Sequence, residues 1–387
     1  MPEMFLLLEW QAQMKPLYRV PLMAEIASIP WNGYNVVSTF SGCGGSCLGY
    51  RMAGFRVLWA SEFIEAAQET YRANHPTSHL DTRDIRTVRA EDILQATGLE
   101  PGQLDLLDGS PPCASFSTSG SREKGWGTVK KYSDKSQRTD DLFFEYARIL
   151  RGLQPKVFVA ENVSGLIKGT AKGYFLEILA ELKSCGYRVK AKLLDAQWLG
   201  VPQQRERLIF VGVREDMGLE PVHPDPLGYR YTVREVLPWV QAVKWSGAPN
   251  NWRTSDSPSP TIIASGANIS PTAYLSGGSY IRAEDVDLEQ IFVGFNINYK
   301  QVWKPAGSTP APTIKTAGEP RAEGLKVGQV ERLFTIPELR RICAFPDDFI
   351  LTGNFSQQWE RMGRAVPPVM MMHIASTIKE EVLCKIK

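Results

Sequence analysis

The chain has 387 residues, with 44 lysines and arginines against 42 aspartates and glutamates. This length suits a large α/β domain with a smaller second domain. The net charge of +2 excludes no class of partner, because basic residues can gather on one face. No stretch is long and apolar enough to cross a membrane, so we expect a cytoplasmic protein without a membrane contact.

Six cysteines are scattered without paired CxxC spacing, which indicates free thiols in a reducing compartment and no metal site. Buried cysteines are usually inert. This is the expectation for Cys43, Cys47, Cys185, Cys343 and Cys384. Cys113 differs, because two prolines stiffen the turn before it and a polar stretch follows it. It is a candidate nucleophile.

Short apolar runs alternate with helical periodicity from Asn35 to about residue 215, which is typical of βαβ units around a parallel sheet. Strands are expected at 34–40, 56–62, shortly before Asp84, at 104–109 and at 156–162, and helices at 41–55, up to about Asn74, at 139–155 and at 174–185. Segments 187–196 and 205–213 are typical of a hairpin. Helical signal returns at 335–345 and after Pro367.

The fold class is therefore α/β, with a smaller irregular domain. The expected divisions are an N-terminal extension at 1–33, a catalytic and cofactor-binding domain at 34–215, a smaller domain at 216–333 and a return to the catalytic domain at 334–387. The smaller domain holds a near-repeat, SPSPTI at 257–262 and TPAPTI at 309–314. We interpret both copies as strand entries that pack on a core, in preference to base contacts.

Glycines follow the first expected strand and open a helix, where backbone N–H groups and the helix dipole can receive a ligand. Gly42 is followed twenty residues later by Glu62, at the usual place for an acid that holds ribose hydroxyls. Asp84 follows the third strand and can accept from an adenine amino group. No GK[ST] follows the turn, so a P-loop is excluded. The pattern favours a nucleoside cofactor over a purely structural turn.

Several reactive side chains follow strands whose carboxyl ends share one edge of the sheet. Cys113 follows the fourth strand, Glu161 ends the fifth, and Arg205 and Arg207 lie in the turn of the hairpin. In an open α/β sheet this edge borders the ligand crevice. The stretch 115–141 combines glycine and serine with lysine and arginine, which fits either a solvated loop or a lid that meets phosphates.

The ordered blocks FSGCGG, SEF, RDI, PPC, DLFF, ENV, QQRER, FPDDF and GRAVPP resemble those of the DNA cytosine-5-methyltransferase family. The resemblance covers the chain from about Asn35 to its end. It implies a Rossmann-like large domain that binds S-adenosyl-L-methionine, and it assigns target recognition to 216–333. Double-stranded DNA is the implied partner, and we expect a monomer.

The resemblance also implies the chemistry. A Cys113 thiolate adds to carbon 6 of a flipped cytosine, and carbon 5 then takes up a one-carbon group. Glu161 hydrogen-bonds ring nitrogen 3 and the 4-amino group. Arg205 favours the thiolate or holds the base oxygen, and Arg207 braces Glu161 or the hairpin. Loss of the carbon 5 proton and elimination of the cysteine restore the ring.

The same resemblance implies a set of cofactor-binding residues. They are Phe40, Gly42, Cys43, Gly45, Glu62, Phe63, Asp84, Ile85, Pro112, Leu142, Arg364, Ala365 and Val366.

Arg364 departs from the family pattern, which has asparagine after this glycine. An arginine about 4 Å from a sulfonium is repelled by about 4 kcal/mol at an effective dielectric near 20. One hypothesis is that Arg364 turns outward or pairs with a nearby acid. The other is that it binds the carboxylate of carboxy-S-adenosyl-L-methionine, which makes the product a carboxymethylcytosine. Ala114, where glutamine is common, is a smaller departure.

Two further functions compete with DNA modification. The chain can be a catalytically silent DNA-binding relative, although the intact PPC, ENV and QxRxR blocks count against this. It can also be a tRNA cytosine-5-methyltransferase, although the sizeable smaller domain favours duplex DNA.

Overall fold

A computed structural model gives the fold. It describes residues 15–112, 130–132, 135–137, 141–167, 172–237, 244–245, 252–253, 291–297, 300–305, 310–311, 324–327 and 330–386. Cys113, most of the expected lid, the SPSPTI segment and much of 216–333 lie outside these residues.

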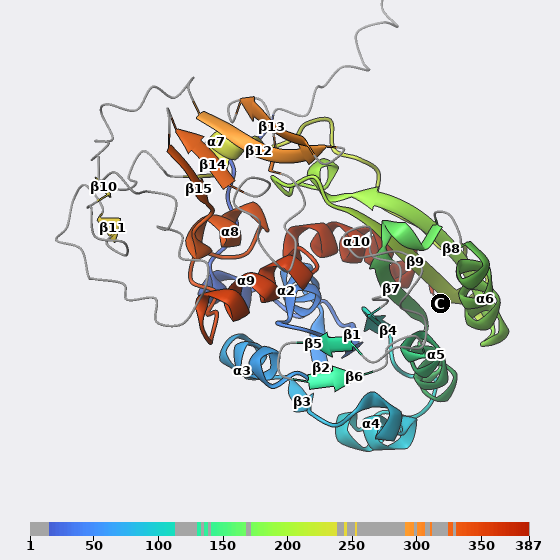
Figure 1. Cartoon of the computed structure of the whole chain (residues 1–387). Coiled ribbons are helices and arrows are strands. Elements are labelled where there is room, and N and C mark those ends of the chain that lie inside the picture. The colour runs from blue at the N-terminus through green and yellow to red at the C-terminus, as the bar shows by residue number, and fades with distance from the viewer. Residues whose placement is uncertain are drawn as a thin grey trace, which may run out of the picture.

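A seven-stranded sheet forms the centre, in the order β3-β2-β1-β4-β7-β9-β8 (Figure 1). The strands are β1 (Asn35–Thr39), β2 (Arg56–Ser61), β3 (His79–Asp81), β4 (Leu106–Gly109), β7 (Val157–Val163), β8 (Tyr187–Asp195) and β9 (Glu206–Arg214). The first five run parallel, as expected. The sheet as a whole is mixed, because β9 pairs antiparallel with both β7 and β8.

The central strands separate two apolar cores, so their sequences are nearly continuous apolar runs. Val36 faces one core and Val37 the other. Helices cover both faces (Figure 1). One core includes side chains of α4 (Ala90–Thr97), α5 (Leu142–Leu153) and α6 (Lys172–Ser184). The other includes side chains of α1 (Met23–Ala27), α2 (Gly45–Met52), α3 (Glu65–Asn74), α7 (Val233–Val236), α8 (Ile336–Ile342), α9 (Phe355–Arg364) and α10 (Pro368–Glu381).

Part of the N-terminal extension packs on the body of the protein. Tyr18 Oη donates to the carbonyl of Arg341 at 2.6 Å, and Tyr231 Oη donates to the carbonyl of Pro16 at 2.9 Å. The side chain of Ile26 on α1 is buried in a core. The extension therefore ties the segment before α7 to the end of α8.

The remaining strands form small antiparallel units. Four of them pair in the order β13-β12-β14-β15, and two further pairs are β5 with β6 and β10 with β11. Their bounds are Lys130–Tyr132 (β5), Lys135–Gln137 (β6), Lys244–Trp245 (β10), Trp252–Arg253 (β11), Ile291–Ile297 (β12), Lys300–Pro305 (β13), Gly324–Val327 (β14) and Val330–Leu333 (β15). The four-stranded unit lies within the stretch expected to be an irregular domain.

Ala311, in the second near-repeat, packs against the turn between β8 and β9. Its N–H donates to the carbonyl of Pro202 at 2.9 Å, and its carbonyl accepts from the N–H of Gln204 at 2.7 Å. Its side chain is fully buried. Ala311 therefore packs on the catalytic body, whereas the repeat predicted packing on the core of the smaller domain.

Gly212 on β9 lies opposite Phe158 on β7, and a Cβ at this glycine would lie 2.0 Å from the Phe158 ring. We expect Gly212→Ala to lower the free energy of unfolding by about 1–3 kcal/mol, because the core is overpacked. Gly173→Ala on α6 is the control, since no described atom lies within 4 Å of its added Cβ. Urea unfolding measures both, and equal midpoints would contradict the clash.

Candidate functional site

Three neighbouring parallel strands end at the same edge of the sheet. Thr39 on β1 pairs with Gly109 on β4, and Gly109 pairs with Ala160 on β7. The next residues are the glycine turn after β1, the Ser110–Pro112 turn after β4, and Glu161. Asn162 Nδ2 donates to the carbonyl of Pro111 at 3.3 Å. Cys113 follows Pro112 directly and lies outside the described residues.

Glu161 forms an ion pair with Arg207 of β9. Arg207 Nε lies 2.7 Å from Glu161 Oε1, and each side chain is 12% exposed. Burial lowers the pKa of Arg207, and the Glu161 carboxylate acts against this shift. Arg207 Nη1 also donates to the carbonyl of Glu206 in the hairpin at 2.7 Å, so the structure shows both contacts that the sequence left open, with Glu161 and with the hairpin. The pair fixes the position of the carboxylate.

Arg205 is almost fully buried and points to the segment that precedes α10. Its Nη2 donates to the carbonyls of Gly363 at 3.0 Å and Ala365 at 2.7 Å. Burial, followed by the charge of Arg207, lowers the pKa of Arg205 to about 9. Arg205 therefore holds the backbone on either side of Arg364. Its two expected roles, favouring the Cys113 thiolate or holding the base oxygen, stay predictions.

The glycine turn and Glu62 form one hydrogen-bonded unit. Glu62 Oε2 accepts from the N–H of Gly42 at 2.8 Å, and Oε1 accepts from the N–H of Ile64 at 2.7 Å. Burial raises the pKa of Glu62, and Arg361 and Arg364 are among the groups that oppose this rise. Phe40 and Gly42 both have positive φ, 54° and 57°. The backbone thus bends sharply toward the carboxylate.

The segment around Val366 approaches the same turn. A Cβ at Gly45 would lie 2.3 Å from the carbonyl oxygen of Val366, so only glycine fits at the start of α2. Cys43 Sγ lies 3.9 Å from the carbonyl of Arg361. Burial raises the pKa of the Cys43 thiol to about 12, which agrees with an inert cysteine. Residues 42–45 and 361–366, far apart in sequence, lie together.

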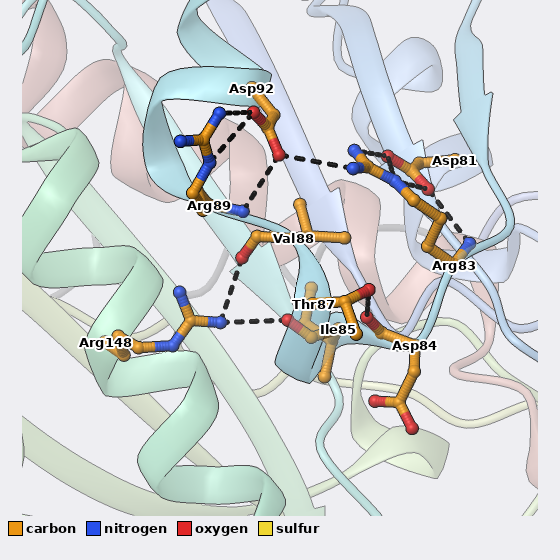
Figure 2. A network of polar contacts seen from close by, with 9 residues as sticks. All are labelled: Asp81, Arg83, Asp84, Ile85, Thr87, Val88, Arg89, Asp92 and Arg148. Atoms are coloured by element: carbon orange, nitrogen blue, oxygen red, sulfur yellow. Dashed lines mark hydrogen bonds and ion pairs between the residues drawn. The ribbon is translucent and has the colours of Figure 1, made fainter.

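Asp84 begins the 3₁₀ turn Ile85–Thr87 and accepts from the N–H of Arg86 at 3.0 Å. The Arg86 guanidinium lies 3.1 Å from Asp84 and 2.8 Å from Asp141, which precedes Leu142. Arg148 Nη2 donates to the carbonyl of Ile85 at 2.9 Å (Figure 2). Arg86, a residue that sequence reasoning missed, therefore joins Asp84 to the start of α5, and Arg148 joins Ile85 to the same helix.

Figure 2 also shows a network of ion pairs next to this turn. Asp92 of α4 contacts Arg83 at 3.2 Å and Arg89 at 2.8 Å, and Arg83 lies 2.6 Å from Asp81 at the end of β3. The Asp84 carboxylate points away from Asp92 (Figure 2). These ion pairs hold the segment on both sides of the 3₁₀ turn, and the Asp84 carboxylate takes no part in them.

Arg364, at the end of α9, forms an ion pair with Glu360. Its Nη2 lies 2.5 Å from Glu360 Oε1, and Arg361 Nη2 lies 3.1 Å from Glu360 Oε2. One carboxylate thus bridges two guanidinium groups. This geometry agrees with the hypothesis that Arg364 pairs with a nearby acid.

One expectation about the cysteines was wrong. Cys384 is exposed, whereas Cys43, Cys47, Cys185 and Cys343 are buried. It lies in a short 3₁₀ turn, Leu383–Lys385, of which only Leu383 is buried. The turn lies at the surface and packs on the protein through Leu383 alone, so the Cys384 side chain is left exposed to solvent.

The residues at the glycine turn fit a nucleoside cofactor. No described atom lies within 4 Å of the Cβ position at Gly42, so the backbone is open on that side. Each oxygen of the Glu62 carboxylate has a second lone pair that can accept from a ribose hydroxyl. Phe63, Pro112 and Ala365 are half-buried, whereas Ile85, Leu142 and Val366 are buried.

Within the described ranges, no group of three or more His, Cys, Asp or Glu side chains could hold a metal ion. No helix in that part of the chain is long and apolar enough to span a membrane.

Comparison with known proteins decides the family. The sequence model for C-5 cytosine-specific DNA methylases matches residues 34–380. The chain belongs to this family. It is therefore an enzyme of the DNA (cytosine-5-)-methyltransferase type, as its ordered blocks predicted.

Its relatives include Type II methyltransferases. The chain is 30% identical over 378 residues to M.NgoPII of Neisseria gonorrhoeae, which covers 92% of this chain and 99% of that protein. It is also 30% identical to M.FnuDI of Fusobacterium nucleatum, covering 91% of this chain and 96% of that protein.

Solved structures share the fold. A candidate DNA modification methyltransferase from an E. coli prophage has a TM-score of 0.63 at 22% identity, over 91% of this chain and 100% of that one. DNMT2 of Spodoptera frugiperda has a TM-score of 0.58 at 16% identity, over 91% of this chain and 100% of that one. The Rossmann-like fold class is confirmed.

His75 is buried at the glycine turn, stacked on Tyr71 with ring centroids 4.4 Å apart. Burial, aided by Arg51, lowers the pKa of His75 to about 3. The ring stays neutral in the folded protein but gains a proton in the unfolded chain below pH ~6.5. We therefore expect the free energy of unfolding to fall as pH drops from ~6.5 to ~4, and His75→Phe to reduce that fall.

Denaturant unfolding at several pH values measures this slope. His79→Gln, at an exposed histidine, is the control and should keep the wild-type slope. Equal slopes for the wild type and His75→Phe would show that His75 does not cause the acid sensitivity.

Proposed function

We propose that the protein methylates carbon 5 of cytosine in double-stranded DNA, with Cys113 as the nucleophile and Glu161 as the residue that contacts the ring. The observation that carries this proposal is the Glu161–Arg207 ion pair beside the turn that leads to Cys113. The Asn162–Pro111 hydrogen bond joins the strand of Glu161 to that turn. We therefore propose that a flipped base placed there is reached by both the Cys113 thiol and the Glu161 carboxyl.

Each proposed residue has a chemical task. The Cys113 thiolate forms a bond to carbon 6, which makes carbon 5 electron-rich. Glu161 accepts from the 4-amino group, and a proton held between its other oxygen and ring nitrogen 3 limits the charge that develops in the ring. Carbon 5 then takes the methyl group, and the sulfur that carried it leaves as a neutral thioether. Transfer of the carbon 5 proton to a solvent base finally expels the thiolate and restores the double bond. Arg207 acts by holding Glu161 in place.

S-adenosyl-L-methionine is the proposed donor, and it supplies an electrophilic methyl group. Glu62 and the Gly42 backbone are proposed to hold the ribose. Phe40, Asp84 and Ile85 are proposed to contact the adenine, and Pro112 and Leu142 to line the pocket. The Arg86 bridge between Asp84 and Asp141 supports this placement. Residues 216–333 are proposed to read the target sequence. The Type II relatives support a role in restriction-modification.

Mass spectrometry of nucleosides tests the reaction. Purified protein is incubated with S-adenosyl-L-methionine and either duplex DNA or tRNA. We expect 5-methylcytosine in the DNA only. Methyl gain in tRNA alone would establish the RNA reaction, and no gain in either substrate would favour the silent DNA-binding relative.

Glu161→Gln tests the proposed role of the carboxyl. We expect the single-turnover rate of methyl transfer to fall by about 10²–10⁴-fold, because the amide cannot supply the same proton to the ring. The matched control is Glu181→Gln, which breaks an exposed pair with Arg151. Such surface pairs contribute little. A Glu161→Gln rate within threefold of the wild type would remove Glu161 from the mechanism.

The alternative donor is carboxy-S-adenosyl-L-methionine, with its carboxylate on Arg364. The effect of Arg364 on the Glu62 carboxyl supports a position near the donor site. The Glu360 ion pair favours the ordinary donor, since the Arg364 charge already has an acidic partner.

Arg364→Asn separates the two donors. We expect the ratio of methyl to carboxymethyl product, measured with both donors in competition, to stay unchanged. Glu360→Gln, which removes the partner and keeps Arg364, is the comparison variant. A loss of carboxymethyl product of about tenfold or more in Arg364→Asn, the effect of one charge-assisted hydrogen bond, would establish the carboxylated donor.

A further inference from the structure

Asp108 is a buried acid that the proposed mechanism does not use. It is the third residue of β4, directly before Gly109, and is 1% exposed. Ser38 Oγ of β1 donates to its Oδ2 at 2.8 Å, and Tyr50 Oη of α2 donates to its Oδ1 at 3.2 Å. An unpaired carboxylate at this depth would be costly, so these donors are needed.

The hydrogen bonds continue into the glycine turn. Ser41 Oγ lies 3.0 Å from Ser38 Oγ and 3.0 Å from the carbonyl oxygen of Ser38, so both acceptors are within reach of its single hydroxyl hydrogen. Ser41 is the residue directly before Gly42. A chain of three polar side chains therefore runs from β4, through β1, to the turn that receives the proposed donor.

We propose that Asp108 is a positioning residue, whose carboxyl holds the donor-binding turn through Ser38 and Ser41 and keeps it in register with the strand that leads to Cys113. This proposal rests on the proposed donor site at the glycine turn. Asp108 touches neither the base nor the donor in this role, and it acts through the two serines.

The protonation state of Asp108 changes these hydrogen bonds. Burial raises the pKa of Asp108 to about 7, with a further rise from Glu161, while Ser38 and Tyr50 act in the opposite direction. The other titratable groups that face it are Cys47 and Tyr50 on α2 and Tyr146 on α5. None of these three is a cation, so the ionised Asp108 carboxylate is stabilised by the hydroxyl groups of Ser38 and Tyr50.

The ionised carboxylate accepts from both hydroxyls, and both bonds are charge-assisted. A protonated carboxyl must itself donate, and its nearest acceptors are Ser38 Oγ and Tyr50 Oη. One bond then reverses and loses its ionic strengthening, which is about half of its strength. The turn is held less firmly at low pH. Donor affinity should therefore fall as pH drops through ~7.

The experiment measures equilibrium binding of S-adenosyl-L-methionine by calorimetry from pH 6 to 8. We expect the wild-type affinity to fall by about tenfold toward pH 6. Asp108→Asn should bind about tenfold more weakly at pH 8 and show a flat profile. Asp105→Asn is the matched control: its buried carboxyl near the amino end of β4 pairs with Lys156, away from the turn. It should keep the wild-type profile.

Tyr50→Phe keeps the test decisive if Asp108→Asn does not fold. Loss of one donor to the carboxylate raises its pKa. The midpoint of the affinity profile should therefore move to higher pH. An infrared band of the protonated carboxyl, followed in the protein without donor, should titrate near pH 7 and be absent in Asp108→Asn.

An unchanged profile in both Asp108→Asn and Tyr50→Phe would overturn the proposal. A wild-type protein that binds donor with the expected profile but modifies no cytosine would leave Asp108 in its role and refute the proposed function. The two failures are thus distinguishable.

Discussion

Parallel pairing of β1, β4 and β7 is the constraint on which the site depends. The register aligns Thr39, Gly109 and Ala160 across the three strands, so the residues that follow them emerge at one edge. Gly109 makes this alignment possible, because a Cβ there would lie 2.5 Å from Thr39 Oγ1. The glycine turn, the Ser110–Pro112 turn and Glu161 are neighbours for this reason, although they come from three separate parts of the chain.

Buried arginines connect this edge to the C-terminal part of the chain. Charged groups inside a protein need partners, and here those partners lie on other elements. Arg207 reaches Glu161 across the sheet, and Arg205 reaches the carbonyls on both sides of Arg364. Gly45 contacts the same C-terminal segment through the carbonyl of Val366. The proposed base-binding and donor-binding sides are therefore one packed unit.

Sequence periodicity predicted much of the catalytic body. The expected strands and helices around the glycine turn and Glu161 appear within a few residues of their predicted bounds, because buried parallel strands have continuous apolar sequences. The convergence at one edge followed from the general topology of open α/β sheets. The antiparallel position of β9 beside β7 did not follow, since hairpin pairing alone leaves open where a hairpin joins the sheet.

Side-chain partners were harder to predict. Arg86 joins Asp84 to Asp141, which lies 55 residues further along the chain, and no local pattern reveals such a contact. Asp108 lies in an apolar run, and the sequence does not reveal that its hydrogen-bond donors come from β1 and α2. Helix α9 had a usable signal, the capping pair of Asn354 and Gln357, that sequence analysis missed. With that helix in place, the four-residue spacing of Glu360 and Arg364 predicts their ion pair.

That ion pair changes the electrostatic argument about the donor. The repulsion of about 4 kcal/mol expected between Arg364 and a sulfonium assumes an arginine without a compensating acid. In the structure, Glu360 bridges Arg361 and Arg364, and the buried Glu62 carboxyl is within the influence of both. The formal charges of these two guanidinium groups and two carboxyl groups sum to zero. A cationic donor then meets little net repulsion, whereas a carboxylated donor must compete with Glu360 for Arg364.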